Sequence, residues 1–66
     1  MKVEELREMT MEELKQKERE LKRKLFNLRF QRARGELDNI AELVKTRKDI
    51  ARVMTVSREQ MRKAEG

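Results

Sequence analysis

Hydrophobic side chains in the first half of the chain recur every three or four positions, which is the spacing of one face of an α-helix. Glu18 occupies the one position of this pattern, between Leu14 and Leu21, that is not hydrophobic. The same spacing resumes after Gly35, with Arg47 and Ser57 at the interrupted steps. The two stripes consist of Met11, Leu14, Leu21, Leu25 and Leu28, and then of Ile40, Leu43, Ile50, Met54 and Met61. Two amphipathic helices are predicted, one on each side of the glycine.

The start of the first long helix has the pattern of a capping box. Thr10 and Glu13 occupy the N-cap and N3 positions, where side chains can bond free backbone N–H groups of the first turn. Met9 and Leu14 stand at the two positions of a hydrophobic staple. The pattern predicts a helix over about 10–34.

Gly35 predicts the end of that helix, because glycine takes the left-handed conformation that satisfies the last carbonyl groups. Asn39, with Glu42 three residues later, has the pattern of the next N-cap. A turn over about 35–39 is so short that the helices it joins must be antiparallel neighbours. The second long helix is predicted over about 40–63.

Upstream of the hairpin, Val3 and Leu6 among several glutamates predict a short helix over about 2–9 that folds back on the two long ones. Neither long helix can bury its stripe alone, so the two stripes are expected to face each other. The predicted fold class is all-α, with a short N-terminal helix followed by a long antiparallel two-helix hairpin. Residues 1–66 are expected to form a single domain.

Some apolar residues lie outside the two stripes. Phe26 and Phe30 stand one helical turn apart and point away from the leucines, and Val53 and Val56 lie off the stripe of the second helix. The Phe patch is expected to pack under the turn or against the short N-terminal helix. The alternative is a docking surface for another protein or for an unstacked base.

The composition excludes most catalytic chemistry. Charged residues make up 47% of the chain, and Cys and His are both absent. The usual ligands of zinc, iron and copper are therefore missing, together with the common nucleophile and general base. We expect no enzyme, no catalytic residue, no metal site, no cofactor and no small-molecule substrate. With neither a long apolar run nor a signal peptide, the chain is expected to be cytoplasmic and to have no contact with a membrane.

The net charge of +5 is unevenly distributed along the chain. Segments 15–34 and 45–66 carry +7 and +4, whereas 1–14 and 35–44 carry −3 each. Cations at one-turn spacing can follow a run of phosphates, although they can also serve only to keep a helix soluble. Arg47 is expected either to snorkel past the apolar seam or to face phosphate. The polar ridges consist of Lys17, Lys24, Asn27, Gln31 and Arg34 on the first helix, and of Lys45, Lys48 and Arg52 with Thr55 on the second.

Three segments stand in order along most of the chain. They are Leu25-Phe26-Asn27-Leu28-Arg29-Phe30-Gln31, the turn Gly35-Glu36-Leu37, and Arg47-Lys48-Asp49-Ile50-Ala51-Arg52-Val53 with Thr55. Together they resemble the large-subunit ribosomal protein twenty-nine family, and the likeness begins at the Glu-Glu-Leu-Arg run from Glu4.

The resemblance implies a three-helix protein that binds large-subunit ribosomal RNA near the peptide exit tunnel and stabilises its packing. It also implies a neighbouring ribosomal protein at the tunnel exit, in the area where trigger factor and the signal recognition particle dock. By position the resemblance implies RNA contacts at Asn27, Arg29, Gln31, Arg47, Lys48, Arg52 and Thr55. The ridge of the first helix adds Lys24 and Arg34, which completes the expected RNA-binding set. Phe26 and Phe30 are assigned to protein docking.

Two other functions fit the same patterns. One is a self-associating coiled-coil adaptor, in which the stripes pair between chains. Gly35 and the charged interruptions Glu18 and Arg47 argue against such a continuous zipper. The other is a different basic RNA-binding helical protein, including a disordered segment that folds only when it binds.

Overall fold

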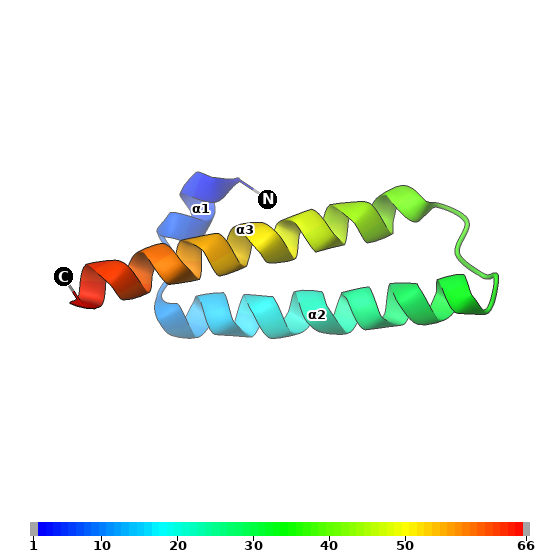
Figure 1. Ribbon diagram of the computed structural model, residues 1–66, viewed down its shortest axis with the longest axis horizontal. Helices are drawn as coiled ribbons and strands as arrows, with labels where there is room; N and C mark the ends of the chain where they lie inside the picture. The colour runs from blue at the N-terminus through cyan, green and yellow to red at the C-terminus, as the bar shows by residue number, and fades with distance from the viewer. Residues whose placement is uncertain (1, 66) are drawn as a thin grey trace.

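A computed structural model describes residues 2–65, the last of these without its side chain, and contains three helices (Figure 1). The short helix α1 covers Val3–Arg7, α2 covers Met11–Ala33 and α3 covers Ile40–Glu65. Helices α2 and α3 run antiparallel and give the molecule a length of 47 Å. The predicted fold class, an all-α hairpin preceded by a short helix, is confirmed.

The predicted capping of α2 is present. Thr10 has extended backbone angles, and its Oγ1 accepts a hydrogen bond of 3.2 Å from the backbone N–H of Glu13. The same hydroxyl donates to Oε1 of Glu13, also at 3.2 Å. The cap satisfies one of the N–H groups that the first turn leaves without a partner inside the helix, and this fixes where α2 begins.

The turn after α2 depends on Gly35, which has a φ of +74°. This conformation lets the N–H of Gly35 bond the carbonyl of Arg32 and the N–H of Glu36 bond the carbonyl of Gln31, at 3.0 and 2.8 Å. The pair of bonds is a Schellman motif, which satisfies carbonyl groups at the end of the helix. Asn39 then begins α3, because its Oδ1 accepts a bond of 2.9 Å from the N–H of Ala41.

The seam between α2 and α3 is built on a seven-residue repeat. Leu14, Leu21 and Leu28 of α2 are buried, as are Leu43 and Ile50 of α3. A repeat of seven residues keeps one side of a helix on the same partner when the two helices coil slightly around each other. The predicted stripe of the first long helix is therefore confirmed by the burial of its leucines.

The predicted stripe of the second long helix was wrong in its orientation. Val53 and Val56, expected off the stripe, are fully buried, whereas Ile40 and Met61, expected within it, are 52% and 53% exposed. Arg47 is exposed as well, and Thr46 takes the buried position beside it. The physical reason is that α3 packs against two helices, so its buried face is turned from α2 toward α1.

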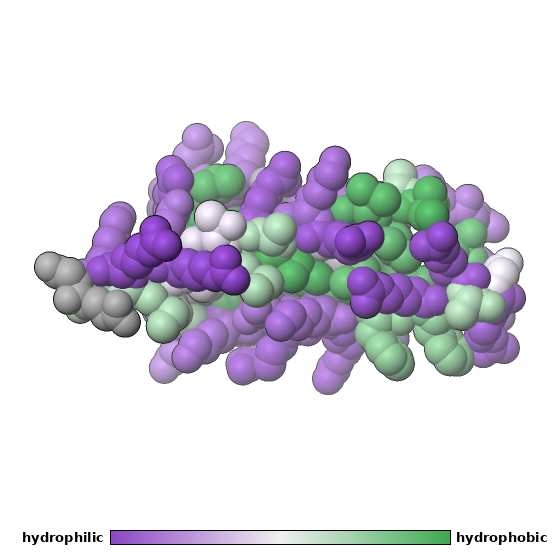
Figure 2. Space-filling view, viewed as in Figure 1, coloured by the Kyte–Doolittle hydropathy of each residue, from purple (hydrophilic) through white to green (hydrophobic). Residues whose placement is uncertain are grey.

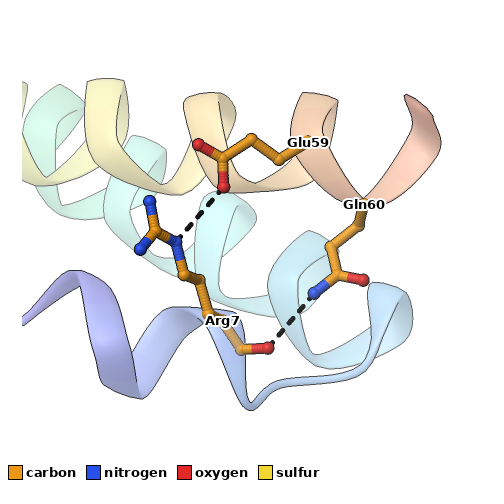
Figure 3. Close-up of polar contacts among 3 residues, drawn as sticks. All are labelled: Arg7, Glu59 and Gln60. Atoms are coloured by element: carbon orange, nitrogen blue, oxygen red, sulfur yellow. Dashed lines mark hydrogen bonds and ion pairs between the residues drawn. The ribbon is translucent and has the colours of Figure 1, made fainter. Parts of the chain in front are cut away.

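Helix α1 is fixed to the C-terminal half of α3 by both apolar and polar contacts. Leu6 is buried in one cluster with Val53 and Val56. Nε of Arg7 donates to Oε2 of Glu59 at 3.3 Å, and the side-chain amide of Gln60 donates to the carbonyl of Arg7 at 3.2 Å (Figure 3). The second bond satisfies a carbonyl at the end of a helix only five residues long. This short helix closes the apolar core at the end of the hairpin opposite the turn (Figure 1).

Truncation of Val53 tests the orientation of α3. Val53→Ala is expected to lower the free energy of unfolding by about 2 kcal/mol, because it removes buried methyl groups and leaves a cavity. Ile40→Ala, at a position that is half exposed, is the matched control and is expected to change stability by less than about 0.5 kcal/mol. Urea denaturation followed by circular dichroism measures both. Equal losses would contradict the orientation described here.

Replacement of Gly35 tests the turn. Apart from Gly35 itself and its two chain neighbours, no heavy atom lies within 4 Å of the position that a methyl group would take at residue 35, so Gly35→Ala meets no steric clash with the rest of the molecule. The cost comes from the positive φ alone and is expected to be about 1 kcal/mol. Gly35→Asn is expected to cost less, because Asn tolerates the left-handed conformation better than Ala. A thermal melt in which Ala and Asn are equally stable would contradict this assignment.

Candidate nucleic-acid interface

All nine residues predicted to bind RNA have exposed side chains, but they do not share one face of the molecule. With a step of about 100° per residue, Lys48, Arg52 and Thr55 of α3 point outward, away from α2, and Arg47 lies on the flank beside the buried Leu43 and Ile50. The five from α2 diverge between the outer side of that helix and its two flanks. The largest coherent group of the predicted set therefore lies on α3. Its members are Arg47, Lys48, Arg52 and Thr55.

Cations on the outer side of α3 surround a small apolar floor. One shallow depression is lined by Val44, Arg47, Lys48 and Ala51, and a second by Ala41, Val44, Lys45, Lys48 and Arg52. The two depressions share Val44 and Lys48 and so form one continuous strip. Small side chains between cations let a ribose–phosphate backbone approach the helix closely. We call the four cations Lys45, Arg47, Lys48 and Arg52 the α3 basic face.

The cations of the α3 basic face differ in their partners. Among the residues that the structure describes, neither Arg47 nor Lys48 takes part in an ion pair. Arg52 lies 3.5 Å from the largely buried carboxylate of Asp49, one turn earlier. The hydroxyl of Thr55 donates to the carbonyl of Ala51 at 2.9 Å, which leaves its oxygen free to act only as an acceptor. Arg47 and Lys48 are thus the cations best placed to meet an anionic partner.

Lys45 was left out of the predicted RNA-binding set, although it lies on the predicted ridge. It lines the second depression together with Lys48 and Arg52. The sequence carried the necessary signal, since the spacings of three, four and seven residues place these three cations on one side of a helix. The place of Val44 between these cations could not be predicted from the sequence in the same way, because single exposed valines are common on helices.

Lys24, also in the predicted set, forms an ion pair between the two long helices. Its Nζ lies 2.6 Å from Oε1 of Glu42 on α3. The hydrogen bond and the charge of Lys24 lower the pKa of the Glu42 carboxyl below its ordinary value of 4.5, and the charge of Lys45 adds to the effect. Much of the charge of Lys24 is therefore matched inside the protein.

The remaining predicted residues of α2 do not form a single surface. Asn27 and Arg34 lie on the outer side of the helix, whereas Gln31 and Arg29 lie on opposite flanks. Arg34 pairs with Glu36 at 3.2 Å, and its guanidinium carbon lies 5.4 Å from the ring centroid of Phe30. The structure therefore separates this half of the predicted set from the α3 basic face.

The expectation that Phe26 and Phe30 pack under the turn or against the short N-terminal helix was wrong. Their side chains are 68% and 54% exposed. Helix α1 packs on α3 at the end of the hairpin away from the turn. Figure 2 shows pale green hydrophobic groups projecting from the outer side of α2 near the turn, between hydrophilic side chains. Their assignment to protein docking stays a prediction.

These features together define the class of protein. It is a small basic helical hairpin whose exposed cations suit the binding of a phosphate backbone rather than catalysis. Within residues 2–65 no three His, Cys, Asp or Glu side chains gather as a metal site. Over the same residues no helix combines the length and apolarity that crossing a bilayer requires.

Comparison with known proteins identifies the family. Residues 4–60 match the family described as Ribosomal L29 protein, and the chain belongs to that family. It is 57% identical over 60 residues to the large ribosomal subunit protein uL29 of Sulfurihydrogenibium sp., covering 91% of this chain and 90% of the relative. The uL29 protein of Enterococcus faecalis is 55% identical over 60 residues, covering 91% and 97%. The family resemblance is confirmed, and because this family is one of structural proteins the chain is not an enzyme.

The ion pair between Lys24 and Glu42 predicts a pH-dependent contribution to stability. Because the pKa of Glu42 is lower in the folded state, the carboxylate favours folding above pH 4.5, and this contribution is lost as the pH falls through the lowered pKa. Glu42→Gln is therefore expected to lower the melting temperature slightly at neutral pH and to have no effect once the carboxyl is protonated.

Removal of the partner is the control for this experiment. In a Lys24→Gln background, Glu42→Gln is expected to change the melting temperature far less at neutral pH, because the pair is already broken. Since both side chains are about half exposed, high salt is also expected to reduce the effect. An effect of Glu42→Gln that is independent of pH would contradict the assignment.

Proposed function

We propose that the chain is a structural constituent of the large ribosomal subunit that binds ribosomal RNA through the α3 basic face. The observation that carries the proposal is the strip in which four exposed cations surround Val44 and the small side chains beside it. Membership of the Ribosomal L29 protein family supports the identity of the RNA. The action is the neutralisation of phosphates and the fixing of RNA packing, without turnover.

The way in which the α3 basic face would hold RNA follows from its geometry. Arg47 and Arg52 lie on the two sides of the strip, with Lys48 near its centre. A backbone lying on Val44 and Ala51 would have a cation on each side, so contacts would go to phosphates rather than to base edges. Recognition of this kind depends on RNA shape, and it weakens as salt concentration rises.

The finer location is also part of the proposal. The family resemblance of the motifs supports a position near the peptide exit tunnel, beside a neighbouring ribosomal protein and in the area of trigger factor and the signal recognition particle. On this proposal the protein works in the cytoplasm as part of the ribosome. From the first long helix, Asn27, Arg29, Gln31 and Arg34 are proposed to contact RNA as well, and Lys24 does so only to the extent that Glu42 leaves its charge unmatched.

The alternative of a self-associating coiled-coil adaptor is less well supported. The leucines that would form a zipper between chains are buried within this chain, where Leu14, Leu21 and Leu28 pack in the hairpin. A dimer built on the same stripe would have to open the hairpin first. The exposed cations of α3 have no role in that alternative.

Charge reversal at Lys48 tests the proposal. Lys48→Glu is expected to weaken binding to a large-subunit ribosomal RNA transcript about tenfold at physiological salt and to reduce the salt dependence of the affinity. The hairpin is expected to keep its helical circular dichroism, because Lys48 is exposed and has no ion-pair partner among the described residues. Lys48 is a cleaner choice than Arg52, where a Glu would stand beside the buried carboxylate of Asp49.

Lys15→Glu is the matched control, since it makes the same change of charge at an exposed position of α2 far from the α3 basic face. It is expected to weaken binding by less than about twofold. An unrelated RNA duplex of equal length is titrated in parallel over the same salt series. Equal affinity of the wild-type chain for both RNAs at physiological salt would overturn the proposed function.

A further inference from the structure

The outer side of α2 carries a second surface, and of its residues the proposed function uses only Arg34. By the step of about 100° per residue, Arg19, Arg23, Phe26, Phe30 and Arg34 share this side, which faces away from the α3 basic face. We call these five residues the α2 aromatic face. All five side chains are exposed.

The two rings are the most unusual part of the α2 aromatic face. Phe26 is 68% exposed and Phe30 is 54% exposed, one helical turn apart. They are the only aromatic residues of the chain, and neither takes part in the core. Adjacent exposed aromatic rings mark an interaction site more often than exposed aliphatic residues scattered singly do.

The charge around the rings indicates the chemistry of the partner. Residues 22–34 contain six cations and no carboxylate, and three of the six pair with carboxylates outside this stretch: Lys22 with Glu18, Lys24 with Glu42 and Arg34 with Glu36. The guanidinium carbon of Arg34 lies 5.4 Å from the ring centroid of Phe30, so a planar cation already stands beside one ring. A hydrophobic partner would have to desolvate these cations, whereas an anionic partner would neutralise them. The density of positive charge therefore favours RNA over a protein.

The spacing of rings and cations also fits RNA. Arg23 lies one turn before the rings and Arg34 one turn after them, so cations stand at both ends of the aromatic pair. Unpaired bases stack on aromatic side chains and on guanidinium planes, whereas the bases of an intact duplex are not accessible in this way. The α2 aromatic face is thus suited to a short unpaired stretch, with its bases over the rings and its phosphates beside the arginines.

We propose that the α2 aromatic face binds unpaired nucleotides of the ribosomal RNA, with a base stacked on Phe26 or Phe30 and phosphates held by Arg23 and Arg34. This inference rests on the proposed function for the identity of the RNA, and it extends that function by adding a second RNA surface. The helical positions put the two surfaces on opposite sides of the hairpin, whose cross-section is 17 by 14 Å. The protein would then join two separate segments of RNA.

The first experiment compares Phe26→Ala and Phe30→Ala with the wild-type chain in binding to a large-subunit ribosomal RNA transcript. The variant that removes the stacked ring is expected to bind about 5- to 150-fold more weakly, the range for loss of one stacked base. The salt dependence of the affinity is expected to stay unchanged, because no charge is removed. Both rings are exposed and Ala favours helix, so circular dichroism is expected to show a folded hairpin.

The second experiment identifies what lies on the rings. Phe26 is replaced by p-azidophenylalanine, the chain is bound to ribosomal RNA together with the other large-subunit proteins, and the complex is irradiated. The expected product is a crosslink to an unpaired nucleotide. Glu12 is the matched control position, because it lies 18 residues before Phe30 and so faces the same side of α2, at its acidic end. The probe at residue 12 is expected to give no crosslink to RNA.

The outcomes separate this inference from the proposed function. If the wild-type chain prefers ribosomal RNA and Lys48→Glu weakens binding, but both alanine variants bind within twofold of wild type, the inference fails and the proposed function stands. A crosslink from residue 26 to a ribosomal protein or to a second copy of this chain would also overturn it. If the wild-type chain shows no preference for ribosomal RNA, both proposals fail together.

Discussion

The rest of the structure depends on the seam between α2 and α3. Each long helix is highly charged and has one narrow apolar face, so neither gains enough from burial to be stable alone. The seven-residue repeat of Leu14, Leu21 and Leu28 against α3 supplies that burial and fixes the rotation of α2. Once the leucines point inward, every other side of the helix is committed to solvent or to a partner. The outward position of Phe26 and Phe30 is therefore a consequence of the seam.

The elements and their ends could be predicted from the sequence because they depend on short-range chemistry. The cap at Thr10, the left-handed Gly35 and the cap at Asn39 each act within a few residues, and all three are present. The orientation of α3 could not be predicted in the same way. Its apolar residues allow two overlapping stripes, and the choice between them is made by Leu6 of α1, some 47 residues from Val53 along the chain. A helix that packs against two partners needs a wider buried face than one partner implies.

The candidate site was harder to predict than the fold for a related reason. Exposure of a cation is easily inferred from helical spacing, and all nine residues are indeed exposed. Which cations remain available is decided across helices, and the pairing of Lys24 with Glu42 depends on how the arms lie together. The depressions around Val44 likewise depend on which side of α3 is left uncovered. Helical spacing predicts which cations lie on the same side of a helix. The tertiary structure decides which of them form ion pairs between helices, as Lys24 does, and which remain on the outer surface.

The distribution of acidic residues explains how so basic a chain can fold and still present a cationic surface. Carboxylates meet cations where helices join: Glu59 pairs with Arg7 between α3 and α1, and Glu42 pairs with Lys24 between α3 and α2. The stretch from residue 22 to residue 34 contains six cations and no carboxylate, and three of these cations pair with carboxylates from elsewhere in the chain, namely Lys22, Lys24 and Arg34. Repulsion among those cations opposes folding of the isolated chain and is relieved by an anionic partner, because phosphates take the place of the missing carboxylates. Binding of such a partner and folding therefore favour each other, and under the two proposals the hairpin, with cations on opposite sides, gains most stability when RNA lies against both.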